Sequence, residues 1–288
     1  MPGSLLAISD LHIRYQENRR ILEDIRPESD QDWLLVPGDV AEYAEDVEWA
    51  LGVLRERFAE VVWTPGNHEL WTVPDDPLRL RGEERYRHLV DRCRALGVIT
   101  PEDPYPLWEG PHGPVVIAPL FLLYDYTFLT SGHLTKAPAL EAAYESGVVC
   151  TDEFYLDPYP YPDRESWCRA RVAWTETRLA QVPEDLPTLL VNHYPLIREP
   201  LNILRYPEFA MWCGTTATAD WPVRFRASAV VYGHLHIPRL IRADGIPHHE
   251  VSLGYPREWK PRPGTPGRLT RIVPGPHRAP APGTERTT

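Results

Sequence analysis

Short apolar runs recur along the chain, and each run ends in turn-forming or polar residues. Runs this short are typical of buried strands, because a buried helix needs a longer apolar pattern. Since the runs are continuously apolar rather than alternating, we expect both faces of the sheets that they form to be covered. The predicted strands are residues 5–9, 33–36, 61–64, 115–118, 188–191, 229–232 and 250–253.

Helix-patterned stretches separate several of these runs. They span residues 18–25, 44–59, 83–96 and 164–181, and Asp163 is a suitable N-cap for the last one. The order is mostly strand, helix, strand. It predicts an α/β fold in which two sheets pack face to face as a sandwich core and helices cover the outer faces.

Two stretches depart from this pattern. Residues 120–163 are rich in Tyr, Pro and Asp without a sustained period, and we expect a long insertion of loops and short helices there. Residues 261–288 contain seven Pro and four Gly, and their only apolar pair is Ile272-Val273. Such a stretch buries too little apolar surface to fold, so we expect a disordered tail after a single domain of residues 1–260.

Charge and cysteine content restrict the partners and the compartment. The net charge is −11, and the seven basic and two acidic residues from Arg257 onward leave the preceding body at −16. An acidic body repels a nucleic-acid backbone, so we do not expect a nucleic-acid partner. The four cysteines have no CxxC spacing, no basic leader precedes the first apolar run, and no apolar stretch approaches the roughly 20 residues that span a bilayer. These features predict a cytoplasmic protein without a membrane partner.

Polar side chains with metal-binding chemistry follow five of the predicted strands. Because the carboxyl ends of parallel strands meet at one edge of a sheet, we expect these side chains to converge there. Two of the blocks contain ligand-type residues two positions apart, which point to the same side of an extended segment. The blocks, in chain order, are Asp10-Leu11-His12, Gly38-Asp39, Gly66-Asn67-His68-Glu69, Asn192-His193 and Gly233-His234-Leu235-His236.

Each block alone also has an ordinary explanation. Asp10 could cap a turn beside a half-exposed His12, Gly-Asp is a common turn pair, and an Asn turn with a solvated Glu would explain the third block. The combination is harder to explain in this way, because five of the eleven histidines fall at the ends of four predicted strands. The other histidines are assigned to the surface or to packing: His88, His112, His133, His248, His249 and His277.

In this order the blocks resemble the calcineurin-like metallophosphoesterase superfamily, and the resemblance extends from residue 4 to about residue 254. It implies a four-layer α/β/β/α fold and two divalent metal ions that share Asp39. The implied ligands are Asp10, His12, Asp39 and His236 for one ion and Asp39, Asn67, His193 and His234 for the other. Carboxylate, imidazole and amide ligands without thiolate suit Mn, Fe or Zn.

The reaction that the resemblance implies is hydrolysis of a phosphate ester by a hydroxide that bridges the two metals. The substrate is then a phosphomonoester or phosphodiester of a small molecule or nucleotide. By the same resemblance Asp39 and His68 are the catalytic residues, with His68 protonating the leaving oxygen or stabilising the charge that develops on it. A supporting hydrogen bond from His68 to Asp10 or to a backbone carbonyl is the alternative, and Glu42 and Glu69 are expected to orient histidines.

Two other functions remain as alternatives. A nuclease of the same superfamily would need a basic groove, which the acidic body disfavours. A non-catalytic scaffold with this fold would be expected to lack catalytic residues, whereas every implied ligand and His68 are present. The candidates for substrate contact are Tyr124, Tyr126, Tyr194 and Tyr255 as aromatic lining and Arg198 and Arg257 as phosphate-binding cations.

Overall fold

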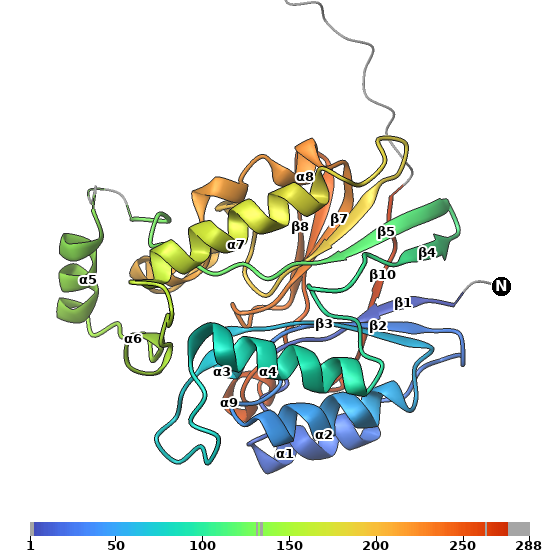
Figure 1. The fold of residues 1–288 in the computed structure, drawn as a ribbon, viewed down its shortest axis with the longest axis horizontal. Coiled ribbons are helices and arrows are strands. Elements are labelled where there is room, and N and C mark those ends of the chain that lie inside the picture. Colours follow the sequence, from blue (N-terminus) through green and yellow to red (C-terminus); the bar gives the residue numbers. More distant parts are fainter. Residues whose placement is uncertain (1–2, 131, 133–134, 263, 276–288) are drawn as a thin grey trace, which may run out of the picture.

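The computed structural model describes residues 3–130, 132, 135–262 and 264–275, and these residues form two mixed sheets (Figure 1). The first sheet has four strands in the order β10-β1-β2-β3. β1, β2 and β3 are parallel, and β10 pairs antiparallel with β1. The bounds are β1 (Leu5–Ala7), β2 (Trp33–Pro37), β3 (Glu60–Thr64) and β10 (Thr270–Ile272).

The second sheet has six strands in the order β4-β5-β6-β7-β9-β8. Its four central strands are parallel, and the edge strands β4 and β8 run antiparallel to their neighbours. The apolar runs do not predict β4 or β8, because these edge strands leave part of their side chains in solvent. The strand predicted at 250–253 is wrong in its bounds, because β9 is the polar stretch before it and shares only Glu250 with the predicted run. The bounds are β4 (Leu107–Gly110), β5 (Gly113–Pro119), β6 (Thr188–Val191), β7 (Ala227–Tyr232), β8 (Arg239–Ala243) and β9 (Ile246–Glu250).

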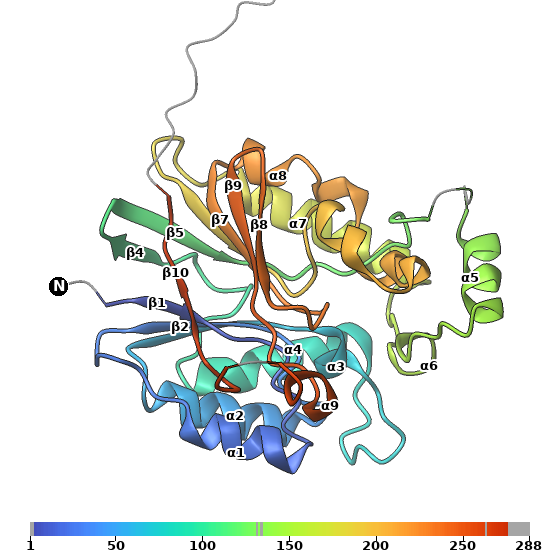
Figure 2. The ribbon, with the colours of Figure 1, turned by 180° about the vertical axis from the view of Figure 1, so that it is seen from behind.

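Helices cover the outer face of each sheet (Figures 1 and 2). α1, α2 and α4 lie along the first sheet, and α7 and α8 lie along the second. The four predicted helices are confirmed, with ends that differ by up to four residues, and Asp163 caps α7 by accepting from the Ser166 backbone nitrogen. The bounds are α1 (Gln16–Asp24), α2 (Ala44–Arg55), α4 (Gly82–Ala95), α7 (Arg164–Leu179) and α8 (Trp221–Arg224).

Shorter helices lie in the loops. α5 (Lys136–Glu145) and α6 (Asp152–Tyr155) belong to the stretch between β5 and α7 and stand at one end of the molecule, away from the sheets (Figure 1). The remaining short helices are α3 (Asn67–Leu70), α9 (Pro256–Trp259) and the 3-10 helices η1 (Glu199–Ile203), η2 (Pro207–Trp212) and η3 (Thr216–Thr218).

Successive side chains of β1 point to opposite faces, which explains why the strand runs are apolar throughout. Leu5 and Ala7 lie in a buried cluster with Ile117 and Val191 of the second sheet. Leu6, between them in sequence, belongs instead to the cluster that contains the helices covering the first sheet. Both faces are therefore buried, and the prediction of two facing sheets with helices outside is confirmed.

The prediction of a disordered tail from residue 261 onward is wrong for the residues around β10. Thr270–Ile272 pair with β1, and Ile272 opposite Leu5 is only 2% exposed. A stretch that cannot form a core of its own can still add a strand, because the exposed edge of β1 supplies hydrogen-bonding partners and an apolar surface. Residues 276–288 lie outside the described residues.

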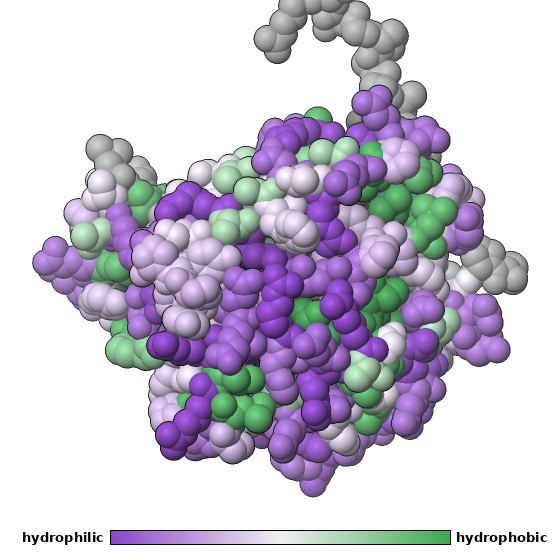
Figure 3. Space-filling model, in the orientation of Figure 1, coloured by the Kyte–Doolittle hydropathy of each residue, from purple (hydrophilic) through white to green (hydrophobic). Residues whose placement is uncertain are grey.

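The remaining surface and cysteine features agree with a packed globular domain. All four cysteines are free and buried, and burial raises the pKa of each thiol and so disfavours the reactive thiolate. The face in Figure 3 is mostly hydrophilic, with hydrophobic residues in small separate groups. Among the helices of the described residues, none combines the length and the apolar content required to cross a membrane.

Replacing Ile272 with Ala tests whether β10 is part of the stable fold. Because the side chain is 2% exposed, we expect the free energy of unfolding to fall by roughly 2–5 kcal/mol. The neighbouring Val273 is 53% exposed, so Val273→Ala is a matched control with an expected change within about 0.5 kcal/mol. Denaturant unfolding measures both values, and equally small losses would contradict a docked strand.

Candidate metal centre

Five loops meet where parallel strands of both sheets end. They follow β1, β2 and β3 in the first sheet and β6 and β7 in the second. The seven predicted ligands all lie on these loops, and each has an atom no more than 3.5 Å from an atom of another. The structure therefore brings together every residue that the sequence patterns singled out for metal binding.

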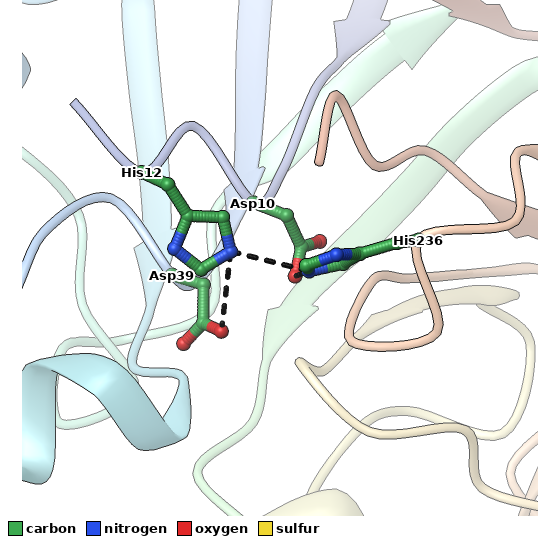
Figure 4. Close-up of side chains that lie close together, drawn as sticks. All are labelled: Asp10, His12, Asp39 and His236. Carbon is green, nitrogen blue, oxygen red and sulfur yellow. Dashed lines mark hydrogen bonds and ion pairs between the residues drawn. The ribbon is translucent and has the colours of Figure 1, made fainter. Parts of the chain in front are cut away.

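The first group of ligands lies next to the end of β1 (Figure 4). One atom each from Asp10, His12, Asp39 and His236 lies within 4.8 Å of all the others. His236 Nε2 is 3.1 Å from both Asp10 Oδ1 and His12 Nε2. His236 Nδ1 donates to the Glu258 carboxylate at 2.7 Å, so Nε2 is the nitrogen available to the group. Two imidazole nitrogens this close need a proton or a cation between them.

The second group contains Asp39, Asn67, His193 and His234. His193 Nδ1 donates to the Pro37 carbonyl oxygen at 2.9 Å, and burial lowers the pKa of His193, so its Nε2 carries a lone pair. That nitrogen faces the amide oxygen of Asn67 at 3.1 Å and Asp39 Oδ2 at 3.5 Å, with His234 Nδ1 at 3.2 Å. His193 Nε2, the Asn67 amide oxygen and Asp39 Oδ2 thus face one another as acceptors, and a divalent cation is a partner that satisfies them together.

Asp39 belongs to both groups. Its Oδ2 lies 3.8 Å from His12 Nε2 and 3.5 Å from His193 Nε2, while Oδ1 accepts from the His68 backbone nitrogen at 3.0 Å. Burial and the nearby charges of Glu69 and Asp10 raise the pKa of Asp39 well above its ordinary value. Positive charge between the groups would stabilise the ionised form of this buried carboxylate, so the donor set fits two cations that share it.

Most of the ligands adopt a backbone conformation that side chains other than glycine rarely take. The left-handed φ angles are 52° at Asp10, 41° at His12, 55° at Asp39, 70° at His234 and 55° at His236. Each costs on the order of 1–3 kcal/mol, so the surrounding fold holds these turns against their local preference. A glycine provides the space, since a Cβ atom on Gly66 would lie 2.1 Å from Asp39 Oδ1.

Two further glutamates fix this geometry. Glu42 Oε1 accepts from His68 Nδ1 at 3.0 Å, as expected for a residue that orients a histidine. The same expectation is wrong for Glu69, whose carboxylate accepts instead from the backbone nitrogens of Asp39 and Gly66, both at 2.9 Å. Glu69 therefore holds the two turns together, and through them the shared carboxylate.

A cavity of about 310 Å³ opens beside the two groups. Tyr255 and Arg257 line it, in agreement with the sequence. Tyr124, Tyr126 and Tyr194 are buried in the core and Arg198 lies away from the lining, so those four predictions are wrong. The full lining is Asp39, Asn67, His68, Trp71, Val149, Cys150, Thr151, Phe209, His234, Leu235, His236, Tyr255, Arg257 and Glu258.

His68 presents one ring nitrogen to this cavity. Its ring packs on Trp71 with centroids 3.7 Å apart, and its Nε2 lies 3.3 Å from the Tyr255 hydroxyl oxygen. Since Nδ1 donates to Glu42, the alternative of a hydrogen bond to Asp10 or to a backbone carbonyl is wrong. Nε2 is the atom that can act on a bound molecule.

Two supporting residues are absent from the sequence patterns. Asp152 in α6 accepts from Asn67 Nδ2 at 2.9 Å, and Glu258 in α9 accepts from His236. Asp152 comes from the irregular stretch between β5 and α7, where no local pattern marks it. Glu258 has a weak signal, because it follows Tyr255 by three residues at a helix start and accepts from that residue's backbone nitrogen.

Comparison with known proteins gives consistent results. The family model for calcineurin-like phosphoesterases matches residues 3–238. An acyl-carrier-protein phosphodiesterase, PptH, of Mycobacterium tuberculosis is 52% identical over 277 residues, which cover 96% of this chain and 85% of the relative. The crystal structure of a phosphopantetheinyl hydrolase (PptH) from Mycobacterium tuberculosis has a TM-score of 0.92 and 51% identity, and the match covers 96% of this chain and 98% of that one.

Metal binding should release protons. Burial alone would lower the pKa of His236, but Asp10 and Glu258 raise it to about 10, and burial raises the pKa of Asp39. His236 therefore holds a proton at neutral pH in the metal-free protein, and the raised pKa of Asp39 acts in the same direction. Ligation removes the proton of His236, so metal affinity should rise as the pH increases toward about 10. Calorimetric titration with Mn²⁺ in buffers of different ionisation enthalpy measures the release. An identical binding enthalpy in every buffer would contradict it.

Proposed function

Because the chain belongs to the calcineurin-like phosphoesterase family, it is a metal-dependent hydrolase of phosphate esters, and we propose that it cleaves the phosphodiester joining phosphopantetheine to an acyl carrier protein. The observation that carries this proposal is the similarity to PptH over 96% of the chain. At this coverage the match necessarily includes most of residues 120–163, which the general family pattern leaves open. Val149, Cys150 and Thr151 of that stretch line the cavity, so the match extends to the surface that a substrate would touch.

The chemistry of the cavity supports a phosphodiester of this kind. His68, Tyr255 and Arg257 provide hydrogen-bond donors and positive charge, whereas Val149 and Leu235 add apolar surface. In a phosphopantetheine ester the charged phosphate is separated by one methylene group from a carbon that bears two methyl groups, so the ester can contact both the polar and the apolar parts of the lining. The net charge of −11 also supports a local, metal-assisted phosphate site over an extended nucleic-acid groove.

We further propose that two divalent ions, of Mn, Fe or Zn, occupy the two groups of ligands. Asp39 is shared, Asp10, His12 and His236 complete one set, and Asn67, His193 and His234 complete the other. When bound, such ions neutralise phosphate oxygens and supply a water of lowered pKa. The chain itself holds the ligands in strained turns and keeps their lone pairs directed inward, which prepares the site before substrate arrives.

His68 is the proposed proton donor to the leaving oxygen. Glu42 accepts from its Nδ1 and so fixes the orientation of the ring, while Nε2 faces the cavity beside Tyr255. In a phosphopantetheine ester both possible leaving groups are alkoxides of high pKa, which depart readily only when protonated. Arg257, at the cavity lining, is the proposed cation for the phosphate or for the group attached to it.

We also infer a cytoplasmic location. Its support is the four free, buried cysteines, which are typical of a protein in a reducing compartment. A location of this kind can be tested by fractionation of the source cells with an antibody against the protein.

Incubating the metal-loaded protein with a holo-acyl carrier protein tests the substrate. We expect the carrier to lose the mass of its phosphopantetheine group, as measured by intact-protein mass spectrometry. Asp39→Asn is the control, because it keeps the side-chain size but removes the shared charge and should lose both metal and turnover. Hydrolysis of an aryl phosphodiester with no change in the carrier would show that the substrate is different.

His68→Ala should reduce turnover most for esters with poor leaving groups. General acid help is typically worth about 10²–10⁴-fold, so the rate on an alkyl phosphodiester should fall by that order and the rate on a nitrophenyl diester much less. Metal content should stay unchanged, because His68 is not a proposed ligand. Equal losses on both esters would assign His68 to charge stabilisation or positioning, and a loss of metal would assign it to support of the ligands.

A further inference from the structure

Asp152 is a buried carboxylate that contacts a candidate ligand from outside the recurring sequence blocks. It lies at the start of α6, 85 residues from Asn67, and is 0% exposed. Its Oδ1 accepts from Asn67 Nδ2 at 2.9 Å and from Trp71 Nε1 at 2.6 Å. Since a carboxylate can only accept, Asn67 must turn its amide nitrogen toward Asp152 and its amide oxygen toward His193.

The orientation of Asn67 matters because the two ends of an amide have opposite hydrogen-bonding roles. Turned by half a rotation, Asn67 would direct an N–H group at His193 Nε2, which carries a lone pair because Nδ1 donates to Pro37. At the observed spacing of 3.1 Å this would be a good hydrogen bond. It would occupy the lone pair that an ion needs and would place a donor where the ion requires an acceptor.

Other contacts keep Asp152 in place and connect it to the cavity. Arg164 Nη2 donates to the Asp152 backbone oxygen at 2.6 Å. Trp71, the second donor to Oδ1, carries the ring on which His68 packs. Within the described residues Asp152 Oδ2 is buried without a hydrogen-bond partner, and such an oxygen is stabilised by positive charge nearby.

We propose that Asp152 is a positioning residue that selects which atom of Asn67 faces the second ion and thereby sets the affinity of the Asn67, His193 and His234 position for metal. This inference rests on the proposed ligand set but not on the identity of the substrate. The test measures metal binding and needs no substrate. Failure to cleave the carrier protein would therefore count against the proposed substrate, whereas unchanged metal binding would count against the role of Asp152.

Asp152→Leu removes the acceptor and keeps the number and branching of the side-chain heavy atoms. We expect one divalent ion to bind as in the wild type and the other to bind about 10–100-fold more weakly, measured by calorimetry with Mn²⁺ and by metal content after dialysis. Asp152→Asn is the matched control and should keep both ions, because Trp71 Nε1 holds an amide oxygen at the Oδ1 position. Two ions bound with wild-type affinity in Asp152→Leu would overturn the proposal.

Substituting the ligand provides a rescue that general structural damage would not show. An aspartate side chain presents an oxygen to the ion in either of its two flipped orientations. Adding Asn67→Asp to Asp152→Leu should therefore restore the affinity for the second ion. In the wild-type background Asn67→Asp sets two carboxylates against each other at the 2.9 Å contact and should weaken that ion. Failure of the rescue, or tighter binding in the single variant, would overturn the proposal. Asn67→Asp in the wild-type background tests the proposal even if Asp152→Leu does not fold.

Discussion

The carboxylate of Asp39 is the group on which the arrangement of the metal centre depends. It is buried between two sets of imidazoles, and acceptor atoms from both sets converge on it. Such crowding is unfavourable unless cations accompany it, because buried negative charge needs a nearby positive partner. Backbone contacts hold this carboxylate in place. Glu69 accepts from the backbone nitrogens of two turns, and Gly66, which has no side chain, leaves room for the Asp39 carboxylate.

The two-sheet architecture makes this convergence possible. Five strands from two sheets end at the same edge, so ligands separated by more than two hundred residues in the chain become neighbours. The same packing explains the apolar character of the strands, since each has one face toward the other sheet and one toward helices. Packing of the core thus determines where the strands end, and the loops that follow the strands can hold the functional side chains.

The parts of the molecule that the sequence predicts are those with a local cause. The central strands other than β9, the four long helices and the convergence of the seven ligands follow from apolar periodicity and from the polar residues after each strand. Asp152 and Glu258 were not predicted, because each acts through one tertiary contact that no local pattern encodes. Three tyrosines expected at the cavity are core residues instead, since an aromatic ring suits both environments equally. Asp and His adopt left-handed turns more readily than most residues do, but residue type alone does not show which of them are in such turns.

The pairing of β1 with β10 has a consequence for synthesis of the chain. β1 precedes β10 in the chain, so it is synthesised before the strand that covers its open edge. While the residues between β1 and β10 are translated, the nascent first sheet has an unpaired edge, which is a site for association with other strands. Glu258, which accepts from His236, lies only twelve residues before β10, so the support of the first ligand group and the cover of the sheet edge become available close together in synthesis. Completing the sheet and supporting this ligand therefore depend on the same part of the chain.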